Sequence, residues 1–298
     1  MPTFYFNGAV DSEWTTLDNW WMTFDGTNYS NQATSLPSSG DNVILNEGAV
    51  TSNTGSSITI LSLTMNNGSY IQPQTEEDSI TIYVTNETIL NGNSNITGHT
   101  TVNGDISLYT SASIGCVVSG NVILNDTSYI LGIDSAQIDG DVVFKDYSHF
   151  DEGISSSTNL LDIIGTATFN DYSYVSQNWG LKLSNAIFND SSYVLAEVAG
   201  VQAIDNIIFN DDSYISNYGY TASDNVIFND DSYIEEDGSV VHSSLVIFNH
   251  NSYMTDNAVI DNVDNIIFND NSINKVGLGT VVVNRTKGVN GSSILGIV

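Results

Sequence analysis

The sequence is poor in basic residues, and this shortage excludes several functions. Only five of the 298 residues are Lys or Arg, against 35 Asp and Glu, so the formal net charge is −30. A chain this acidic is repelled by nucleic acids and by anionic membranes, which argues against a partner of either kind. Its charge instead favours cations, a salty medium or basic partner proteins.

Cysteine, proline and long apolar runs are also scarce. The single cysteine, Cys116, cannot form an internal disulfide, so packing and backbone hydrogen bonds must stabilise the fold. No apolar run approaches the roughly 18 residues of a membrane-spanning helix. The opening MPTFYFNGAV lacks a basic segment followed by an apolar one, so no secretory signal is predicted. Few prolines and abundant Asn, Ser, Thr, Ile and Val indicate β-structure.

What the chain has in abundance is a repeat, whose best copies read TFNDYSYV, IFNDSSYV, IFNDDSYI and IFNHNSYM. The apolar residue before the Asn, here called position 0, falls at Met65, Leu90, Leu108, Leu124, Phe144, Phe169, Phe188, Phe209, Phe228, Phe248 and Phe268. A period of about 20 residues with a β-rich composition predicts a solenoid in which each repeat is one coil. The lattice of leucine-rich repeats and the period of helical repeats are absent. We therefore predict an all-β, right-handed parallel β-helix.

Stacking coils about 4.8 Å apart turns each position of the repeat into a column of like residues. Position 0 should point into the core, and alternation along the strand turns position +6 inward as well. Position +1 is usually Asn, and stacked Asn side chains are expected to form hydrogen bonds from amide to amide. Position +4 is Ser in nearly every coil, which predicts a tight corner that faces inward.

The column at position +2 is mostly Asp and is the candidate cation site. Unit charges about 4.8 Å apart repel by about 0.9 kcal/mol even in water, so the repulsion within such a column must be reduced by cations. Two explanations are open: dissolved cations screen the column, or carboxylates such as Asp190, Asp211 and Asp230 bind Ca²⁺. No EF-hand loop or GGxGxD repeat is present. Apart from Ca²⁺, no cofactor is predicted.

The column at position +5 is mostly Tyr and is predicted to face outward. Flat aromatic faces stack on sugars, so these residues are a candidate glycan-binding surface; alternatively, they stack on one another and stabilise this side of the coils. The candidate residues are Tyr174, Tyr193, Tyr214, Tyr233 and Tyr253.

The column at position −1 should also face outward, yet it is apolar. Soluble monomers rarely expose a continuous apolar row. Either β-branched residues simply suit a strand or lie under a loop, or the row is an interface in a homo-oligomer or with another protein. The candidate interface residues are Ile187, Ile208, Ile227, Ile247 and Ile267.

Catalytic chemistry is not predicted. Neighbouring carboxylates occur at Asp211-Asp212 and in the Glu-Glu-Asp run from Glu235, and glycosidases use such pairs. These acids recur in coil after coil, however, whereas a catalytic pair is usually a singular break in a repeat. His149 and His250 replace members of the Tyr and Asp columns and lack metal-ligand spacing. No nucleophile elbow, phosphate-binding loop or dinucleotide motif is present.

The two ends differ from the repeat. Residues 1–60 hold three of the four Trp and are predicted to form an aromatic N-terminal cap and the first strands, because an open solenoid end exposes core and strand edges. Residues 61–274 form the coils. Residues 275–298 hold three of the five basic residues and end in GVNGSSILGIV. They are predicted to be a C-terminal cap or a docking tail.

The opening segment carries a recognisable pattern in Trp14, Asn19-Trp20, Pro37, Gly40-Asp41 and Val43-Ile44. Over about the first 70 residues it resembles bacteriophage virion-associated β-helix proteins and related bacterial surface β-solenoids. The resemblance implies a non-enzymatic structural protein of the virion: a fibre, spike or decoration protein that displays a rigid acidic surface. It would contact other virion proteins and adhere to host surface glycans. The alternatives are a bacterial cell-surface adhesin and, third, a tailspike-type enzyme that degrades polysaccharide.

Overall fold

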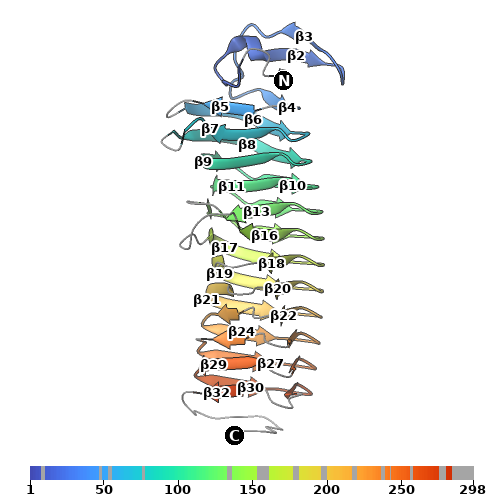
Figure 1. The fold of residues 1–298 in the computed structure, drawn as a ribbon, viewed down its shortest axis with the longest axis vertical. Helices are drawn as coiled ribbons and strands as arrows, with labels where there is room; N and C mark the ends of the chain where they lie inside the picture. Colours follow the sequence, from blue (N-terminus) through green and yellow to red (C-terminus); the bar gives the residue numbers. More distant parts are fainter. Residues whose placement is uncertain are drawn as a thin grey trace. The chain divides into compact units, whose positions relative to one another are not determined.

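The chain forms an all-β parallel solenoid, as the repeat predicted. The computed structural model describes residues 1–7, 11–46, 49–52, 56–75, 78–132, 136–152, 161–176, 181–195, 200–216, 220–235, 239–241, 243–255, 258–274 and 280–283. Across these residues, β-strands and one short 3-10 turn are the only regular elements (Figure 1). They group into two compact units, Met1–Gly140 and Asp141–Val298, which are described in turn.

The first unit opens with a small antiparallel sheet built around tryptophan. Strand β1 (Thr3–Phe6) pairs antiparallel with β2 (Trp20–Phe24), which follows the turn η1 (Leu17–Asn19) and pairs with β3 (Tyr29–Gln32). Trp20 is fully buried, its ring lies edge-on to Phe6 and Trp14, and its indole N–H donates to the Trp14 carbonyl at 2.8 Å. That this aromatic cluster caps the solenoid stays a prediction.

Three parallel ladders make up the rest of the first unit. The first ladder contains β1 and then β4 (Asn42–Leu45), β6 (Ser56–Met65), β8 (Ile80–Asn91), β10 (Ile106–Tyr109) and β12 (Val122–Leu124). The second contains β5 (Ala49–Ser52), β7 (Tyr70–Pro73), β9 (Asn95–Asn103), β11 (Ser113–Val118) and β13 (Tyr129–Gly132). The long strands β6, β8, β9 and β11 continue into a third ladder, which also holds β14 (Gln137–Ile138).

The second unit also has three parallel ladders, and Figure 1 shows its strands stacked coil after coil. The first contains β15 (Val142–Phe144), β17 (Leu161–Phe169), β19 (Leu181–Phe188), β21 (Gly200–Phe209), β24 (Asn225–Phe228), β27 (Leu245–Phe248) and β30 (Asn265–Phe268). The second contains β16 (His149–Glu152), β18 (Tyr174–Ser176), β20 (Tyr193–Leu195), β22 (Tyr214–Ser216), β25 (Tyr233–Ile234), β28 (Tyr253–Met254) and β31 (Ile273–Asn274). The beginnings of β17, β19 and β21 form the third with β23 (Tyr220–Ala222), β26 (Ser239–Val241), β29 (Val259–Val263) and β32 (Thr280–Val283).

Strands pair so that residues of the same column lie side by side, although the number of residues between them varies from coil to coil. Met65 pairs with Leu90, although 25 residues separate them, and Leu108 pairs with Leu124 over 16 residues. The uneven lengths are therefore absorbed between strands. The columns also begin earlier than the sequence alignment placed them, since Leu45 pairs with Met65 and Phe6 with Leu45. Of the predicted terminal segment 275–298, only residues 280–283 are described, as strand β32.

The core consists of the columns predicted to face inward. Every position 0 residue from Met65 to Phe248 is fully buried, and the Phe rings of the second unit stack almost parallel at centroid distances of 4.4–4.9 Å. The Ser residues at position +4 are buried too. Several of their hydroxyl groups donate to backbone carbonyls: Ser213 donates to the Phe188 carbonyl at 3.2 Å and Ser232 to that of Phe209 at 3.2 Å, whereas the buried hydroxyl groups of Ser173 and Ser252 have no hydrogen-bond partner among the described residues. The predicted inward corner is confirmed.

Candidate functional site

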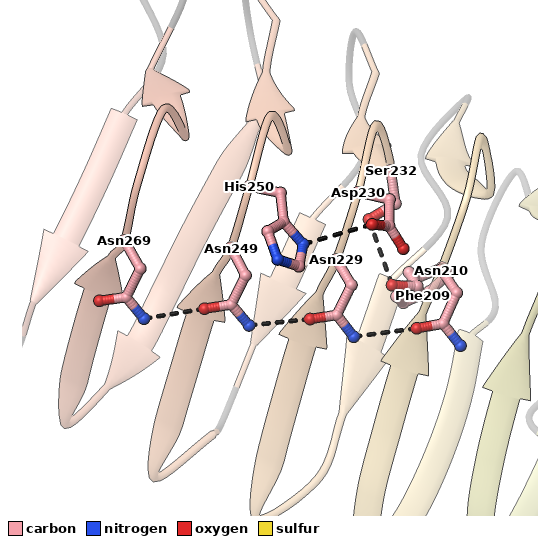
Figure 2. A network of polar contacts seen from close by, with 8 residues as sticks. All are labelled: Phe209, Asn210, Asn229, Asp230, Ser232, Asn249, His250 and Asn269. Atoms are coloured by element: carbon pink, nitrogen blue, oxygen red, sulfur yellow. Dashed lines mark hydrogen bonds and ion pairs between the residues drawn. The ribbon is translucent and has the colours of Figure 1, made fainter.

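The Asn column at position +1 forms the predicted amide ladder. Figure 2 shows Asn269, Asn249, Asn229 and Asn210 in one row, each Nδ2 donating to the Oδ1 of the residue in the preceding coil at 2.8–2.9 Å. The row continues through Asn189 and Asn170, also at 2.9 Å. These amides, half-buried except for the exposed Asn269, hold neighbouring coils in register, so the column is a structural element.

A second amide ladder, which was not predicted, lies on the same strands at position −3. Asn225 Nδ2 donates to Asn206 Oδ1 at 3.1 Å, and Asn206 Nδ2 donates to Asn185 Oδ1 at 3.0 Å. The signal was present in the sequence as an Asn three residues before Phe188, Phe209, Phe228 and Phe268. Because positions −3, −1 and +1 share one side of a strand, the Ile column lies between two Asn columns.

The Asp column occupies the left-handed region of backbone space. Every position +2 residue from Asn67 to Asp270 has φ between 47° and 59°. Each lies in a tight turn; in one coil the Ser213 N–H donates to the Asn210 carbonyl at 3.1 Å. Left-handed φ is costly for most residues and is tolerated by Gly, Asn and Asp. The turn conformation therefore accounts for the recurring Asp without a metal.

Two of the three candidate cation ligands, Asp190 and Asp211, accept backbone hydrogen bonds. The Asp190 N–H donates to Asp211 Oδ2 at 3.2 Å, and the Asp171 N–H donates to Asp190 Oδ2 at 3.2 Å. Asp230 is followed in the column by His250, whose Nδ1 lies 3.3 Å from Asp230 Oδ1 (Figure 2). Among the described residues no group of three or more His, Cys, Asp or Glu is arranged to hold a metal ion. Ca²⁺ binding by Asp190, Asp211 and Asp230 stays a prediction.

The candidate glycan-binding residues form a continuous stack of half-buried rings. Centroids of neighbouring rings lie 5.0–5.1 Å apart with planes within 12° of parallel, and the stack continues to the His149 ring. The members are Tyr174, Tyr193, Tyr214, Tyr233 and Tyr253. Because the ring faces within the stack cover one another, a sugar can reach only ring edges and hydroxyl groups there. Glycan binding stays a prediction. If a glycan binds here, this geometry requires that it contacts the ring edges and hydroxyl groups.

The same stack changes the acidity of its hydroxyl groups. Burial raises the pKa of Tyr193, Tyr214, Tyr233 and Tyr253 above the ordinary tyrosine value, because the ionised form is poorly hydrated. The negative charge of Glu235 raises the pKa of the last three further. These hydroxyl groups therefore stay protonated at neutral pH and can donate hydrogen bonds.

The candidate interface residues form an in-register row. Ile187 pairs with Ile208, Ile208 with Ile227, Ile227 with Ile247, and Ile247 with Ile267. Their side chains are half-buried, whereas their neighbours at position −2 and, except for Phe268, at position 0 are buried. The predicted outward direction of the row is therefore correct for these described residues, while its role as an interface stays a prediction.

Two of the candidate catalytic acids act on one tyrosine: burial raises the pKa of Tyr233, and the negative charges of Glu235 and Asp212 raise it further. Asp211 and Asp212 are exposed in the turn, and Glu235 follows Tyr233 at the end of β25. Glu236 and Asp237 lie outside the described residues. The two histidines belong to the columns already described. The prediction that the chain is not an enzyme stays a prediction.

The residues that carry the resemblance have structural roles. The Asn19 side chain is buried and donates to Asp11 Oδ1 at 2.8 Å and to the Glu13 carbonyl at 3.0 Å. The buried Asp41 carboxylate accepts hydrogen bonds from the Ser38 N–H at 2.8 Å and its hydroxyl at 2.7 Å. The pattern thus specifies how the chain folds here and does not identify a reaction.

Comparison of the chain with protein families, with curated proteins and with solved structures gave no match. The part of the chain that the structure describes holds no helix of the length and hydrophobicity needed to cross a membrane. The function is therefore inferred from the geometry and from the resemblance of the opening segment.

Proposed function

We propose that this chain is a non-enzymatic structural protein of a virion: a fibre, spike, or capsid or tail decoration protein. The observation that supports this most is that the same contacts recur from coil to coil. Phe stacks on Phe, Asn bonds to Asn and Tyr stacks on Tyr over the described coils of the second unit. An arrangement of this kind gives rigidity and repeated display, which a fibre or decoration protein needs, and it leaves the acidic turns and the Tyr edges at the surface.

The proposed partners are other virion proteins and a host surface glycan. The Tyr column supplies protonated hydroxyl groups in a regular row beside the acidic turns, on rings whose centroids lie 5.0–5.1 Å apart from coil to coil. A glycan would bind along this row through hydrogen bonds to the hydroxyl groups and contacts with ring edges. Acidic glycans are disfavoured as ligands, because the chain carries a formal net charge of −30.

The test is where the protein is found. Virions should be purified by density gradient from the organism that carries this sequence, and analysed by mass spectrometry and by immunogold labelling with an antibody to this chain. We expect its peptides in constant ratio to the capsid protein, and gold particles on intact virions. Recovery only in the cell-envelope fraction would overturn the proposal and favour the bacterial surface adhesin, which the fold would serve equally well.

The third function, polysaccharide degradation, requires a separate test. Purified protein should be incubated with a broad panel of envelope polysaccharides, and release of reducing ends measured, with Glu235→Ala as the matched variant. We expect no cleavage of any polysaccharide. Cleavage that Glu235→Ala abolishes would contradict the non-enzymatic proposal and identify an acid that takes part.

A further inference from the structure

One face of the second unit carries no charge. It is formed by positions −3, −1 and +1 of strands β19, β21, β24, β27 and β30, and we call it the amide face. Its residues are Asn185, Ile187, Asn189, Asn206, Ile208, Asn210, Asn225, Ile227, Asn229, Leu245, Ile247, Asn249, Asn265, Ile267 and Asn269. In a chain of net charge −30, fifteen adjacent outward positions without an acid are a feature to explain.

The amide face is regular and offers unused hydrogen-bonding capacity. Its strands pair in register, so each column is a straight row with one residue per coil. A side-chain amide has two N–H donors and two lone pairs. Within a ladder, an amide such as Asn229 uses one N–H towards Asn210 and one lone pair towards Asn249. The central Ile row is half-buried and thus retains apolar area for a partner.

We propose that the amide face binds the same face of a second copy of this chain. Like charges oppose association through the acidic turns, and the uncharged face avoids that repulsion. The face is also self-complementary. The two-fold axis lies in the plane of contact and runs either parallel to the Ile row or parallel to the strands. In both arrangements the Ile row of one copy lies on the Ile row of the other, and Asn rows lie on Asn rows. Ile227 belongs to the middle coil of the five, so it lies opposite its own counterpart in either arrangement. This inference does not rest on the proposed function.

The area of the face sets the expected strength. Five coils extend about 24 Å, and the three columns about 16 Å across, which gives about 400 Å² per copy and about 800 Å² for the pair. Stable interfaces bury about 1,200 Å² or more in total. We therefore expect a weak, reversible dimer that forms at high protein concentration. Added NaCl should strengthen it, because salt screens the repulsion between the two polyanions.

The experiment is sedimentation equilibrium of the full chain in EDTA, over a concentration range from about 5 µM to about 500 µM, where a weak complex would form. We expect wild type to dimerise, and Ile227→Asp and Ile227→Lys each to associate at least tenfold more weakly. Mixing these two variants should restore dimers, because opposite charges then meet at the two-fold axis. The matched control is Ile204→Asp, which changes an isoleucine that is 59% exposed on β21 but outside the amide face. It should dimerise like wild type.

Far-UV circular dichroism and urea unfolding should accompany each variant. If a charge at this position prevents folding, Ile227→Thr keeps a β-branched side chain and should still weaken association several-fold. The proposal is overturned if wild type stays monomeric over the whole range, or if folded Ile227 variants dimerise as wild type does. It is also overturned if the Asp and Lys variants are monomeric alone and remain so when mixed, since Ile227 would then not face its counterpart.

Discussion

The recurring Asp at position +2 should be required by the conformation of the turn and not by a bound cation. Asp211 is the test position, because its φ is 55° and Asp190 and Asp230 precede and follow it in the column. The informative series is Asp211→Asn, Asp211→Gly and Asp211→Ala. All three substitutions remove the charge, but only Asn and Gly adopt a left-handed φ at little cost.

The expected magnitudes follow from three effects. Two like charges about 4.8 Å away repel Asp211 by about 1.7 kcal/mol in water and by about 1 kcal/mol at physiological salt, so each substitution relieves roughly this amount. A left-handed φ costs an ordinary residue about 1–2 kcal/mol. The Asp211 carboxylate also accepts the Asp190 N–H at 3.2 Å, and loss of such a bond costs about 0.5–1 kcal/mol. Asn keeps both advantages, and Ala loses both.

Asp211→Asn should therefore equal wild type or exceed it by up to about 1 kcal/mol, and Asp211→Ala should lie about 1.5–3 kcal/mol below Asp211→Asn. Asp211→Gly should fall between them, because Gly loses the acceptor and more backbone entropy. The measurement is urea unfolding followed by circular dichroism, with midpoints compared at unchanged slope. Equal stability of the Asn and Ala variants would refute the conformational explanation. Loss of stability in Asp211→Asn that appears with Ca²⁺ and disappears in EDTA would show a cation site.

Three further predictions concern the other columns. Replacing Asn229 with Leu removes one donated and one accepted amide bond, so urea unfolding should lose about 1–3 kcal/mol; unchanged stability would mean that the ladder contributes nothing. Because the folded pKa of the stacked tyrosines lies above their ordinary value of 10.0, stability should be complete below pH 10 and fall as the pH rises further; absorbance of tyrosinate and alkaline unfolding test this, and Tyr233→Phe should show a smaller fall. The melting temperature should rise with NaCl, and equally with CaCl₂ at the same ionic strength, because both screen the acidic columns; a flat response to both salts would contradict self-repulsion.

The fold could be predicted from the sequence because each position of the repeat holds the same type of residue, buried or exposed, in coil after coil. Phe209 and Ile215 are buried and Asp211 is exposed, as the alternation of a strand with a turn after Asn210 required. The repeated copies average out local ambiguity, so inward and outward positions could be assigned without a structure. The Asn ladder was predicted for the same reason, since identical amides one coil apart have few other partners.

Two features of the sequence have a structural meaning that was not predicted. The Asp column was treated as a problem of charge, although Asn67 and Gly92 occupy the same position and share with Asp a tolerance of left-handed φ. The Asn column at position −3 was not predicted because it lies outside the stretch that the best copies of the repeat share, which starts at position −1. The early start of the columns at Phe6 could not be seen, because a long segment that contains Trp14 and Trp20 separates Phe6 from Leu45 in the sequence.

The in-register pairing has a consequence for how such a chain can change in length. Removing residues 210–228 would join Phe209 directly to Asn229, and every residue beyond the junction would keep its column, since Phe228 and Phe209 occupy equivalent positions. Duplication of the same stretch would likewise add one more coil whose residues keep their columns. A one-residue deletion inside β24, in contrast, would turn every following side chain of that strand to the opposite side. Recombination between coils can therefore lengthen or shorten this protein in whole coils while each new junction remains a native one.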